Sequence, residues 1–304
     1  MIVSLPTQEL REAVGPVTGV DVVLWDGTGE PDRRIEVCVP DYRCTPETLR
    51  RLEGLPRLRV VQTQLAGYDG QLELLAPGVT LCNASGVHDD ATAEHAVGLT
   101  LAVLRGIPES VRGHGSWQRL PEERRSLADS SVLVLGYGSI GRALAGRLLA
   151  HQARVTAVAR RPREDDLVAR VHGLDDLAAL LPDQHVVVVL LPLSEATRGF
   201  VGREVLGRMA DGTLVVNVAR GGVLDTEAVL AEAGRLRFAL DVTDPEPLPD
   251  GHPLWRAPDV LITPHVAGGT TAMLPRISAL VRDQLERYVA GRPLRNVVAG
   301  PERR

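Results

Sequence analysis

The sequence predicts an α/β protein of two domains, one a doubly wound parallel sheet and the other a smaller α/β unit. Three observations support this prediction. The 304 residues suffice for two domains with sizeable cores. Short apolar runs alternate with amphipathic segments along most of the chain, as in parallel sheets whose strands are joined by helices. A glycine-rich turn near the middle of the chain joins one such strand to a helix.

Composition restricts the class of protein. The hydrophobic fraction of 44% and the charged fraction of 24% are those of an ordinary globular protein. The N-terminal stretch MIVSLPTQELREAV lacks the basic and apolar regions of a signal peptide. The longest apolar run, Val186 to Leu191, is too short to span a bilayer. We therefore expect a cytoplasmic protein without membrane contact.

Charge and cysteine content exclude further classes. The net charge of −5, without a basic stripe carrying aromatic residues, argues against nucleic acid as a partner. All 34 basic residues are arginines, which excludes a Schiff-base lysine and the lysine of a phosphate-binding P-loop. Cys38, Cys44 and Cys82 lack the spacing of metal ligands, so we expect reduced, buried thiols and no metal site.

The first hundred residues predict a small α/β unit. Its expected strands are Asp21–Trp25, Ile35–Val39, Arg59–Gln62 and Val79–Asn83, with a helix near Thr48–Leu52. The segment Asp90–Arg105 is apolar over most of its circumference, which predicts a buried helix. A looser polar segment, Gly106–Asp129, follows it.

The stretch SVLVLGYGSIGRALAGRLL, residues 131–149, predicts a strand, a tight turn and a helix. Gly136, Gly138 and Gly141 follow the order G-x-G-x-x-G: the first makes the turn, the second admits a pyrophosphate and the third allows close packing of helix on strand. The N-terminus of the helix would hold the phosphates. This context favours dinucleotide binding over a purely structural turn.

Strands and helices alternate after the glycine-rich turn. The expected strands are Arg154–Ala159, Val186–Leu191, Leu214–Val218, Phe238–Asp241 and Val260–Thr263, and the helices include Glu204–Met209 and Thr226–Glu232. A last helical pattern and a tail, Met273–Arg304, should return to cover the first domain. We expect residues 1–98 with 273–304 to form one discontinuous domain and residues 99–272 the other.

Ligands of an open α/β sheet bind beyond the carboxyl ends of its strands. Chemically capable residues recur at that edge after successive expected strands, namely Arg160 and Arg161, Pro192, Arg220, Asp241 and His265. Arg220 lies in NVARGG, where two glycines permit close approach of a ligand. Its guanidinium can grip a carboxylate in bidentate fashion, although a surface or ion-paired arginine would also fit this position.

A histidine and a glutamate complete a chemical constellation. His265 follows an apolar strand and a proline in LITPH, and Glu246 lies in the proline-rich loop DPEPLP. Although a lone histidine is usually structural, pairing with Glu246 would favour its protonated form and make it an acid that works near neutral pH. Together with Arg220 and a dinucleotide, the pair predicts hydride transfer to a 2-keto acid.

Several motifs resemble one family in the same order and with similar spacing. GYGSIGRALAGRL, LPLSEATRG, NVARGGVLD, LDVTDPEPLP and LITPHVAGGT, with VQTQLAGYD and GVHDDATAEHAVGLTLAVLR upstream, resemble the D-isomer-specific 2-hydroxyacid dehydrogenases, in particular their glyoxylate/hydroxypyruvate reductases. The resemblance covers nearly the whole chain. It implies a Rossmann-type dinucleotide-binding domain, a discontinuous flavodoxin-like substrate-binding (catalytic) domain, and a homodimer.

The resemblance also assigns roles to residues of this chain. Arg220 would bind the carboxylate and carbonyl of the substrate, and His265 would be the acid/base with Glu246 as its partner. The backbone of Leu65, Ala66 and Gly67 would face the substrate, a small 2-keto or 2-hydroxy acid. Asp241 would face the nicotinamide carboxamide. The remaining expected cofactor contacts are Gly136, Tyr137, Gly138, Ser139, Ile140, Gly141, Arg160, Arg161, Leu191, Pro192, Thr197, Val218, Ala219, His265 and Gly268.

Two departures from the family pattern bear on function. Around Ala233-Gly234-Arg235 the chain is about three residues shorter than the pattern, so we expect a trimmed helix end. Where the family carries an acidic residue for the ribose 2′-hydroxyl, this chain has Ala159 followed by Arg160, Arg161 and Arg163. Those arginines favour a 2′-phosphate and hence NADP(H) over NAD(H), the alternative being a solvated basic loop.

Two other functions remain open from the sequence. Transcriptional corepressors of this family, which sense nucleotides, can keep the same three residues, and a dehydrogenase of phosphite could hold its oxyanion on Arg220. Formate dehydrogenases of the family pair the histidine with glutamine, and Glu246 argues against that activity.

Overall fold

A computed structural model describes residues 1–113, 117 and 124–301 of the chain. The chain divides into two compact units. Unit 1 comprises Met1–His88 and Thr271–Arg304, and unit 2 comprises Asp89–Thr270. Unit 2 is therefore an insertion into unit 1, and the predicted two-domain α/β class is confirmed.

Unit 1 is a mostly parallel sheet with strand order β14-β5-β4-β3-β1-β2. Its strands pair in parallel except β14, which runs antiparallel to β5. This is the expected flavodoxin-like order with an added edge strand. Its elements are β1 (Ile2–Leu5), α1 (Gln8–Val14), β2 (Asp21–Leu24), β3 (Val37–Cys38), α2 (Pro46–Arg50), β4 (Val60–Gln62), β5 (Thr80–Cys82), α9 (Met273–Val289) and β14 (Val297–Ala299).

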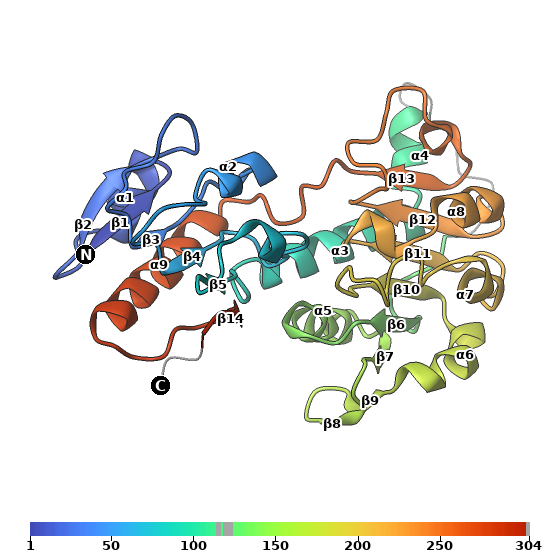
Figure 1. Ribbon diagram of the computed structural model, residues 1–304. Coiled ribbons are helices and arrows are strands. Elements are labelled where there is room, and N and C mark those ends of the chain that lie inside the picture. The colour runs from blue at the N-terminus through green and yellow to red at the C-terminus, as the bar shows by residue number, and fades with distance from the viewer. Residues whose placement is uncertain (114–116, 118–123, 302–304) are drawn as a thin grey trace. The chain divides into compact units, whose positions relative to one another are not determined.

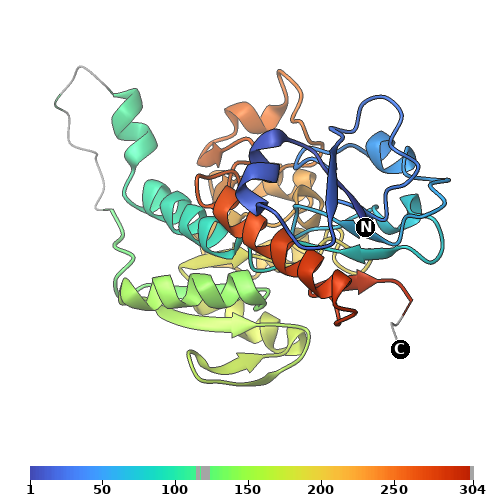
Figure 2. The same ribbon diagram turned by 90° about the vertical axis from the view of Figure 1, so that its left-hand side faces the viewer.

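The last long helix, α9, belongs to unit 1 and completes its core. Ile277, Val281 and Leu285 recur at helical spacing and pack into one apolar cluster with strands β1, β3 and β4. Helices α1 and α9 lie side by side, as Figure 2 shows in blue and red. The side chain of Thr7 caps α1 by accepting from the amide of Leu10 at 3.1 Å. The predicted return of α9 to the first domain is therefore correct.

Unit 2 is a doubly wound sheet with strand order β13-β12-β11-β10-β6-β7-β9-β8 (Figure 1). Only β8 runs antiparallel to its neighbour among the pairs of the described residues. Its elements are α3 (Asp89–Leu104), α4 (Ile107–Arg112), β6 (Ser131–Leu135), α5 (Ser139–Ala150), β7 (Arg154–Val158), β8 (Arg163–Asp165), β9 (Ala169–His172), α6 (Leu177–Leu180), β10 (Val186–Val189), α7 (Arg203–Gly207), β11 (Leu214–Asn217), α8 (Thr226–Glu232), β12 (Arg237–Leu240) and β13 (Val260–Ile262).

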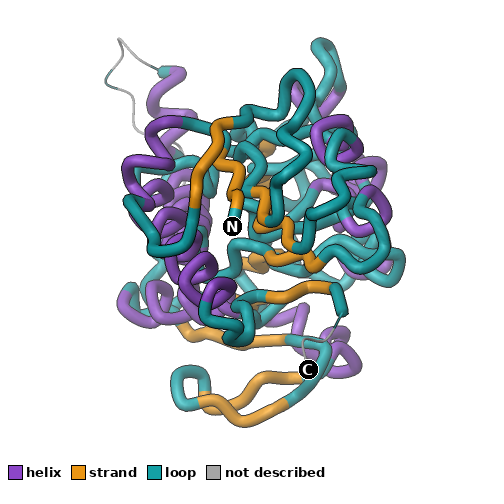
Figure 3. Tube along the Cα trace, turned by 60° about the vertical axis from the view of Figure 1, so that its left-hand side comes forward, coloured by secondary structure: helices purple, strands orange, loops and turns teal. Residues whose placement is uncertain are grey.

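The order of strands in unit 2 reverses between β6 and β10, which are neighbours in the sheet. Strand β10 is a run of valines that is buried on both faces, as expected for a central parallel strand. Figure 1 shows α3 and α5 on one side of this sheet and α6, α7 and α8 on the other, and Figure 3 distinguishes helices, strands and loops along the trace. In doubly wound folds the crevice at such a reversal is where ligands bind.

Helix α3 belongs to unit 2. The expected second domain begins at residue 99, whereas the chain passes into unit 2 at Asp89. Helix α3 packs on α5 and on strands β11 and β12, and its buried residues include Ala93, Ala96, Leu99 and Val103. Because the whole helix buries its apolar surface against unit 2, the boundary precedes it. The expectation that this helix is buried is confirmed.

Several elements were not predicted. Helix α4 occupies the start of the supposedly loose segment Gly106–Asp129, part of which lies outside the described residues. Strands β8 and β9 form a hairpin after β7. Helix α8 ends at Glu232, and Gly234 follows it with φ 89°. In the described part of the chain, no helix combines the length and apolar character needed to cross a bilayer.

Candidate active site

The glycine-rich turn lies at the carboxyl end of β6. Gly136 has φ 110°, and a Cβ there would lie 2.6 Å from the carbonyl carbon of Leu190 after β10. A Cβ on Gly141 would lie 2.4 Å from the carbonyl oxygen of Gly136. A Cβ on Gly138 would meet nothing within 4 Å. The first and third glycines are therefore required by packing, whereas the second leaves space above the N-terminus of α5.

No side chain caps α5 at Gly138, so its first amides, including those of Ser139 and Ile140, are available to an anion. Tyr137, between the glycines, is only 3% exposed. Its hydroxyl donates to Oδ1 of Asp165 at 3.0 Å. Burial and this carboxylate raise the pKa of Tyr137 to about 12.

The β8–β9 hairpin is bonded to the glycine-rich turn. Asp165 accepts from Tyr137 and also from Arg142, at 2.7 Å, and Arg163 donates to the carbonyl oxygen of Tyr137 at 2.8 Å. Arg160 and Arg161, just before the hairpin, are exposed. Among the described residues, their guanidinium groups have no hydrogen-bond partner. Of the three arginines expected in a basic loop, Arg163 is thus hydrogen-bonded to the glycine-rich turn.

The segment after β10 forms a compact loop. Leu191 is 6% exposed, and the carbonyl oxygen of Pro192 accepts from the hydroxyl of Thr197 at 2.6 Å. The same hydroxyl accepts from the amide of Ser194 at 2.8 Å. These bonds fold the loop back on itself at the point where the strand order reverses.

Arg220 is positioned by a buried asparagine at the end of β11. Asn217 is 0% exposed; its Oδ1 accepts from the amide of Ala219 at 3.1 Å and its Nδ2 donates to the carbonyl oxygen of Arg220 at 3.0 Å. Nη1 of Arg220 donates to the carbonyl oxygen of Ala219 at 2.7 Å. A Cβ on Gly221 would overlap the backbone of Thr243, so the turn requires glycine. Val218, before this turn, is 7% exposed.

His265 and Glu246 are in contact. Nδ1 of His265 lies 2.5 Å from Oε1 of Glu246, and both side chains are partly exposed. This hydrogen bond raises the pKa of His265 above its ordinary value, against the opposing effects of burial and of the positive charge on Arg220. The charge of Arg220 acts on the imidazole, so the two side chains lie within electrostatic range of each other. The structure thus brings together the three residues for which the sequence predicts chemistry.

Asp241 connects the end of β12 to the loop that carries His265. Its backbone oxygen accepts from the amide of His265 at 2.7 Å. Its carboxylate accepts from the hydroxyl of Thr263 at 2.6 Å and from the amides of Val266 and Ala267, each at 3.0 Å. Nε2 of His95, on α3, lies 3.2 Å from the same carboxylate. Burial would raise the pKa of Asp241, but these hydrogen bonds lower it to about 2. Gly268 ends this loop.

Sequence reasoning missed Asn217, Thr263 and His95. Asn217 could have been found, because an asparagine that ends an apolar strand beside a glycine-rich turn is a natural backbone anchor. His95 gives no local signal, since it is one polar residue on an apolar helix, and it reaches Thr263 across 168 positions of sequence. No group of three or more metal-ligating side chains occurs among the described residues, so we find no metal centre there.

The loop of Leu65, Ala66 and Gly67 lies in unit 1. The amide of Ala84 donates to the carbonyl oxygen of Leu65 at 2.8 Å, and Nδ2 of Asn83 donates to that of Ala66 at 2.6 Å. In a trans peptide the N–H points opposite to the carbonyl. The amides of Ala66 and Gly67 therefore point away from these partners, and neither bonds to another described residue. Two unbonded donors on successive residues suit an oxyanion or a carbonyl oxygen.

Comparison with known proteins identifies the family to which the chain belongs. The profile described as "D-isomer specific 2-hydroxyacid dehydrogenase, NAD binding domain" matches residues 97–267, more than half of the chain. The chain belongs to the D-isomer specific 2-hydroxyacid dehydrogenases. The family comprises NAD(P)-dependent oxidoreductases that act on the CH–OH group of 2-hydroxy acids, so the predicted enzyme class is confirmed.

Relatives within this family differ in their named substrates. A glycerate dehydrogenase from Methylorubrum extorquens is 31% identical over 264 residues, which cover 81% of either chain. A D-isomer specific 2-hydroxyacid dehydrogenase from Xanthobacter autotrophicus, solved with NADPH and MES, is 29% identical with a TM-score of 0.82, covering 100% of this chain and 99% of that one. An NADPH-dependent glyoxylate/hydroxypyruvate reductase from Sinorhizobium meliloti, solved with NADP and sulfate, is 27% identical with a TM-score of 0.81, covering 98% of both chains.

Proposed function

We propose that this dehydrogenase reduces a small 2-keto acid, of the glyoxylate or hydroxypyruvate type, to the D-2-hydroxy acid, with NADPH as the preferred cofactor. The observation that carries the proposal is the contact of His265 with Glu246 beside Arg220. The raised pKa of His265 favours the protonated imidazole, and a proton donor is what carbonyl reduction requires. The named activities of the Methylorubrum and Sinorhizobium relatives support a substrate of this size.

Each residue has a distinct role in this proposal. Arg220 binds the substrate carboxylate by charge-assisted hydrogen bonds and polarises the carbonyl. The amides of Ala66 and Gly67, in a substrate-binding unit 1, provide further donors. His265 gives its proton to the carbonyl oxygen, and Glu246 holds the imidazole and stabilises its charge. When bound, reduced nicotinamide supplies the hydride.

The residues present fit a dinucleotide. Gly136 and Gly141 form the tight turn, and the space at Gly138 together with the uncapped amides of α5 accommodates a pyrophosphate. Thr197, Leu191, Pro192, Val218, Ala219, Asp241 and Gly268 all lie at this carboxyl edge. In the proposal they surround the nucleotide in unit 2.

The preference for NADPH rests on Arg160 and Arg161. Both follow β7, are exposed and are not engaged by other described side chains, so both can bind a 2′-phosphate. The carboxylate that would accept from a ribose 2′-hydroxyl is replaced by Ala159. The NADPH complex of the Xanthobacter relative is compatible with this assignment.

We also propose that the enzyme is a cytoplasmic homodimer. Large apolar side chains are exposed on and beyond α4: Ile107 is 50%, Val111 68% and Trp117 100% exposed. A second copy of the chain could cover them, and molar mass by light scattering tests this. Cys38, Cys44 and Cys82 form no disulfide with one another, as is common in a reducing compartment.

The test of the proposed function is the loss of reduced-nicotinamide absorbance on addition of glyoxylate, hydroxypyruvate, pyruvate or bulkier 2-keto acids, with NADPH and NADH in parallel. We expect turnover with the small keto acids and NADPH. No turnover on any keto acid, despite tight cofactor binding, would overturn the proposal and leave a nucleotide sensor. Oxidation of phosphite with NADP would point to a dehydrogenase of a non-carboxylate oxyanion.

A further inference from the structure

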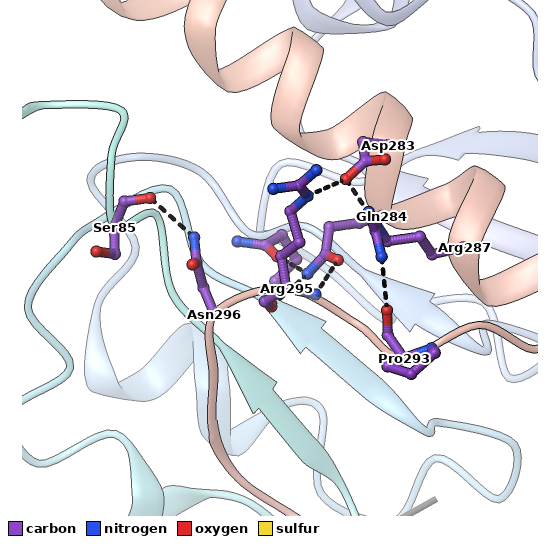
Figure 4. A network of polar contacts seen from close by, with 8 residues as sticks. Ser85, Asp283, Gln284, Arg287, Pro293, Arg295 and Asn296 are labelled. Carbon is purple, nitrogen blue, oxygen red and sulfur yellow. Dashed lines mark hydrogen bonds and ion pairs between the residues drawn. The ribbon is translucent and has the colours of Figure 1, made fainter.

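The C-terminal segment of residues 293–299, here called the strap, is bonded to α9 by a buried glutamine. Gln284 is 4% exposed; its Oε1 accepts from the amide of Arg295 at 2.8 Å and its Nε2 donates to the carbonyl oxygen of Arg295 at 2.9 Å (Figure 4). Asp283 accepts from the guanidinium of Arg295, and Arg287 donates to the carbonyl oxygen of Pro293 at 3.1 Å. The strap is therefore fixed at several points along its length.

The same glutamine connects the strap to strand β4. Nε2 of Gln284 donates to Oε1 of Gln62 at 2.7 Å. Gln62 is 1% exposed, and its own Nε2 donates to the carbonyl oxygens of Thr63 and Asn83, at 2.9 and 3.0 Å. Buried amides destabilise a protein unless they are bonded, and a fully bonded pair is rigid. This pair fixes the backbone on both sides of the Leu65–Gly67 loop.

Asn296 makes the direct connection between the strap and that loop. It has φ 52°, a left-handed conformation that asparagine tolerates better than most residues. Its Nδ2 donates to the carbonyl oxygen of Ser85 at 2.8 Å, and its own carbonyl oxygen accepts from the amide of Asn83 at 3.1 Å. Asn296 thereby holds residues 83–85 by two bonds of opposite direction. Figure 4 shows the bond to Ser85.

Residues 83–85 in turn hold the loop. Oδ1 of Asn83 accepts from the amide of Ser85 at 3.2 Å, which leaves its Nδ2 directed at the carbonyl oxygen of Ala66. Ala84 fixes the carbonyl oxygen of Leu65. Asn83 and Ala84 therefore set the direction of the unbonded amides of Ala66 and Gly67. Asn296 in turn fixes the position of residues 83–85.

We propose that Asn296 and Gln284 are positioning residues, through which the C-terminal strap orients the two amides of Ala66 and Gly67 toward the oxygens of the keto acid. This inference rests on the proposed function. Neither residue touches the substrate. Because the cofactor elements belong to unit 2 and the strap to unit 1, loosening the strap should weaken the use of keto acid while leaving cofactor binding unchanged.

The test compares Asn296→Asp and Asn296→Gly with the control Arg292→Ala. Aspartate keeps the shape and the left-handed backbone but cannot donate to Ser85; glycine keeps only the backbone. Arg292 is exposed, lies four positions away and has no side-chain bond to another described residue. We expect KM for glyoxylate to rise about three- to tenfold in both Asn296 variants, the range for one net hydrogen bond, with Arg292→Ala unchanged.

Three further readouts separate positioning from general stability. The Kd of NADPH, followed by nucleotide fluorescence, should stay within about twofold of wild type, as should kcat. Amide hydrogen exchange of peptides covering 63–70 and 80–86 should accelerate, since Leu65 and Ala84 lose support. Gln284→Ala should give the same pattern.

An unchanged KM in the folded Asn296 variants would overturn the proposal, as would a loss of NADPH binding in proportion to the rise in KM. If the wild-type enzyme reduces no keto acid, the proposed function fails. The exchange data still decide whether the strap supports residues 63–70, since wild-type exchange there in the Asn296 variants would overturn the inference.

Discussion

The imidazole of His265 is bonded through Nδ1 to Glu246, which leaves its Nε2 for a substrate. The backbone of this histidine has φ 51°, and its amide is bonded to the backbone of Asp241. The buried carboxylate of Asp241 accepts hydrogen bonds from the amides of Val266 and Ala267, the two residues after His265. The imidazole proposed as the acid is thus positioned by its own backbone as well as by its carboxylate partner, a form of preorganisation that is useful in catalysis.

Replacing Glu246 by glutamine should move the pH profile of reduction. The bond to Glu246 raises the pKa of His265, so the protonated acid persists above pH 6.5 in the wild-type enzyme. The alkaline limb of kcat/KM for keto acid should therefore lie at lower pH in Glu246→Gln. A group with a raised folded pKa stabilises the fold fully below its unfolded pKa and loses that contribution as pH rises through the folded value. The stability difference between the two proteins should accordingly be largest below pH 6.5. Coincident pH profiles would contradict this role of Glu246.

Replacing His265 by asparagine should remove the proton donor while sparing the cofactor. Asparagine also tolerates positive φ, so the loop should keep its path. We expect kcat to fall by about 10²- to 10⁴-fold, the usual contribution of a general acid. The Kd of NADPH should change little. Turnover near that of wild type would show that the acid lies elsewhere.

Two alanine variants of the glycine-rich turn should differ in what they lose, one in stability and the other in NADPH binding. In Gly141→Ala the added methyl would lie 2.4 Å from a backbone oxygen, so the melting temperature should fall. In Gly138→Ala the methyl meets nothing within 4 Å, so the fold should persist and NADPH binding should weaken. Calorimetry together with nucleotide titration checks both. An affinity for NADPH equal to that of wild type in Gly138→Ala would show that the pyrophosphate does not bind at Gly138.

Replacing Arg160 and Arg161 by serine should reduce the preference for NADPH over NADH. Charge-assisted hydrogen bonds contribute about 1.5–3 kcal/mol, so the ratio of kcat/KM should fall by about tenfold or more, less any screening by solvent. Arg170, exposed on β9, provides a matched control through Arg170→Ser. If the preference for NADPH over NADH is unchanged in the double variant, Arg160 and Arg161 belong to a solvated basic loop that does not bind the cofactor.

The residues at the ends of strands could be predicted because parallel sheets leave local signals. An apolar run followed by glycine, arginine or histidine places that residue at the carboxyl edge, and Arg220 and His265 were found in this way. Strand β14 could not be found: its three residues form a strand only by antiparallel pairing with β5, distant in the sequence. His95 and Asn296 were missed for the same reason, since their roles arise from partners brought near by folding.

The insertion of unit 2 has a consequence for synthesis on the ribosome. Each apolar cluster draws its members from a single unit, and that of unit 1 includes Ile277, Val281 and Leu285 from α9. While the nascent chain is still growing, unit 2 is already complete in sequence, whereas unit 1 lacks its last helix and its edge strand. Unit 2 can therefore form during translation before α9 and β14 are synthesised, and unit 1 becomes whole only after both have been made.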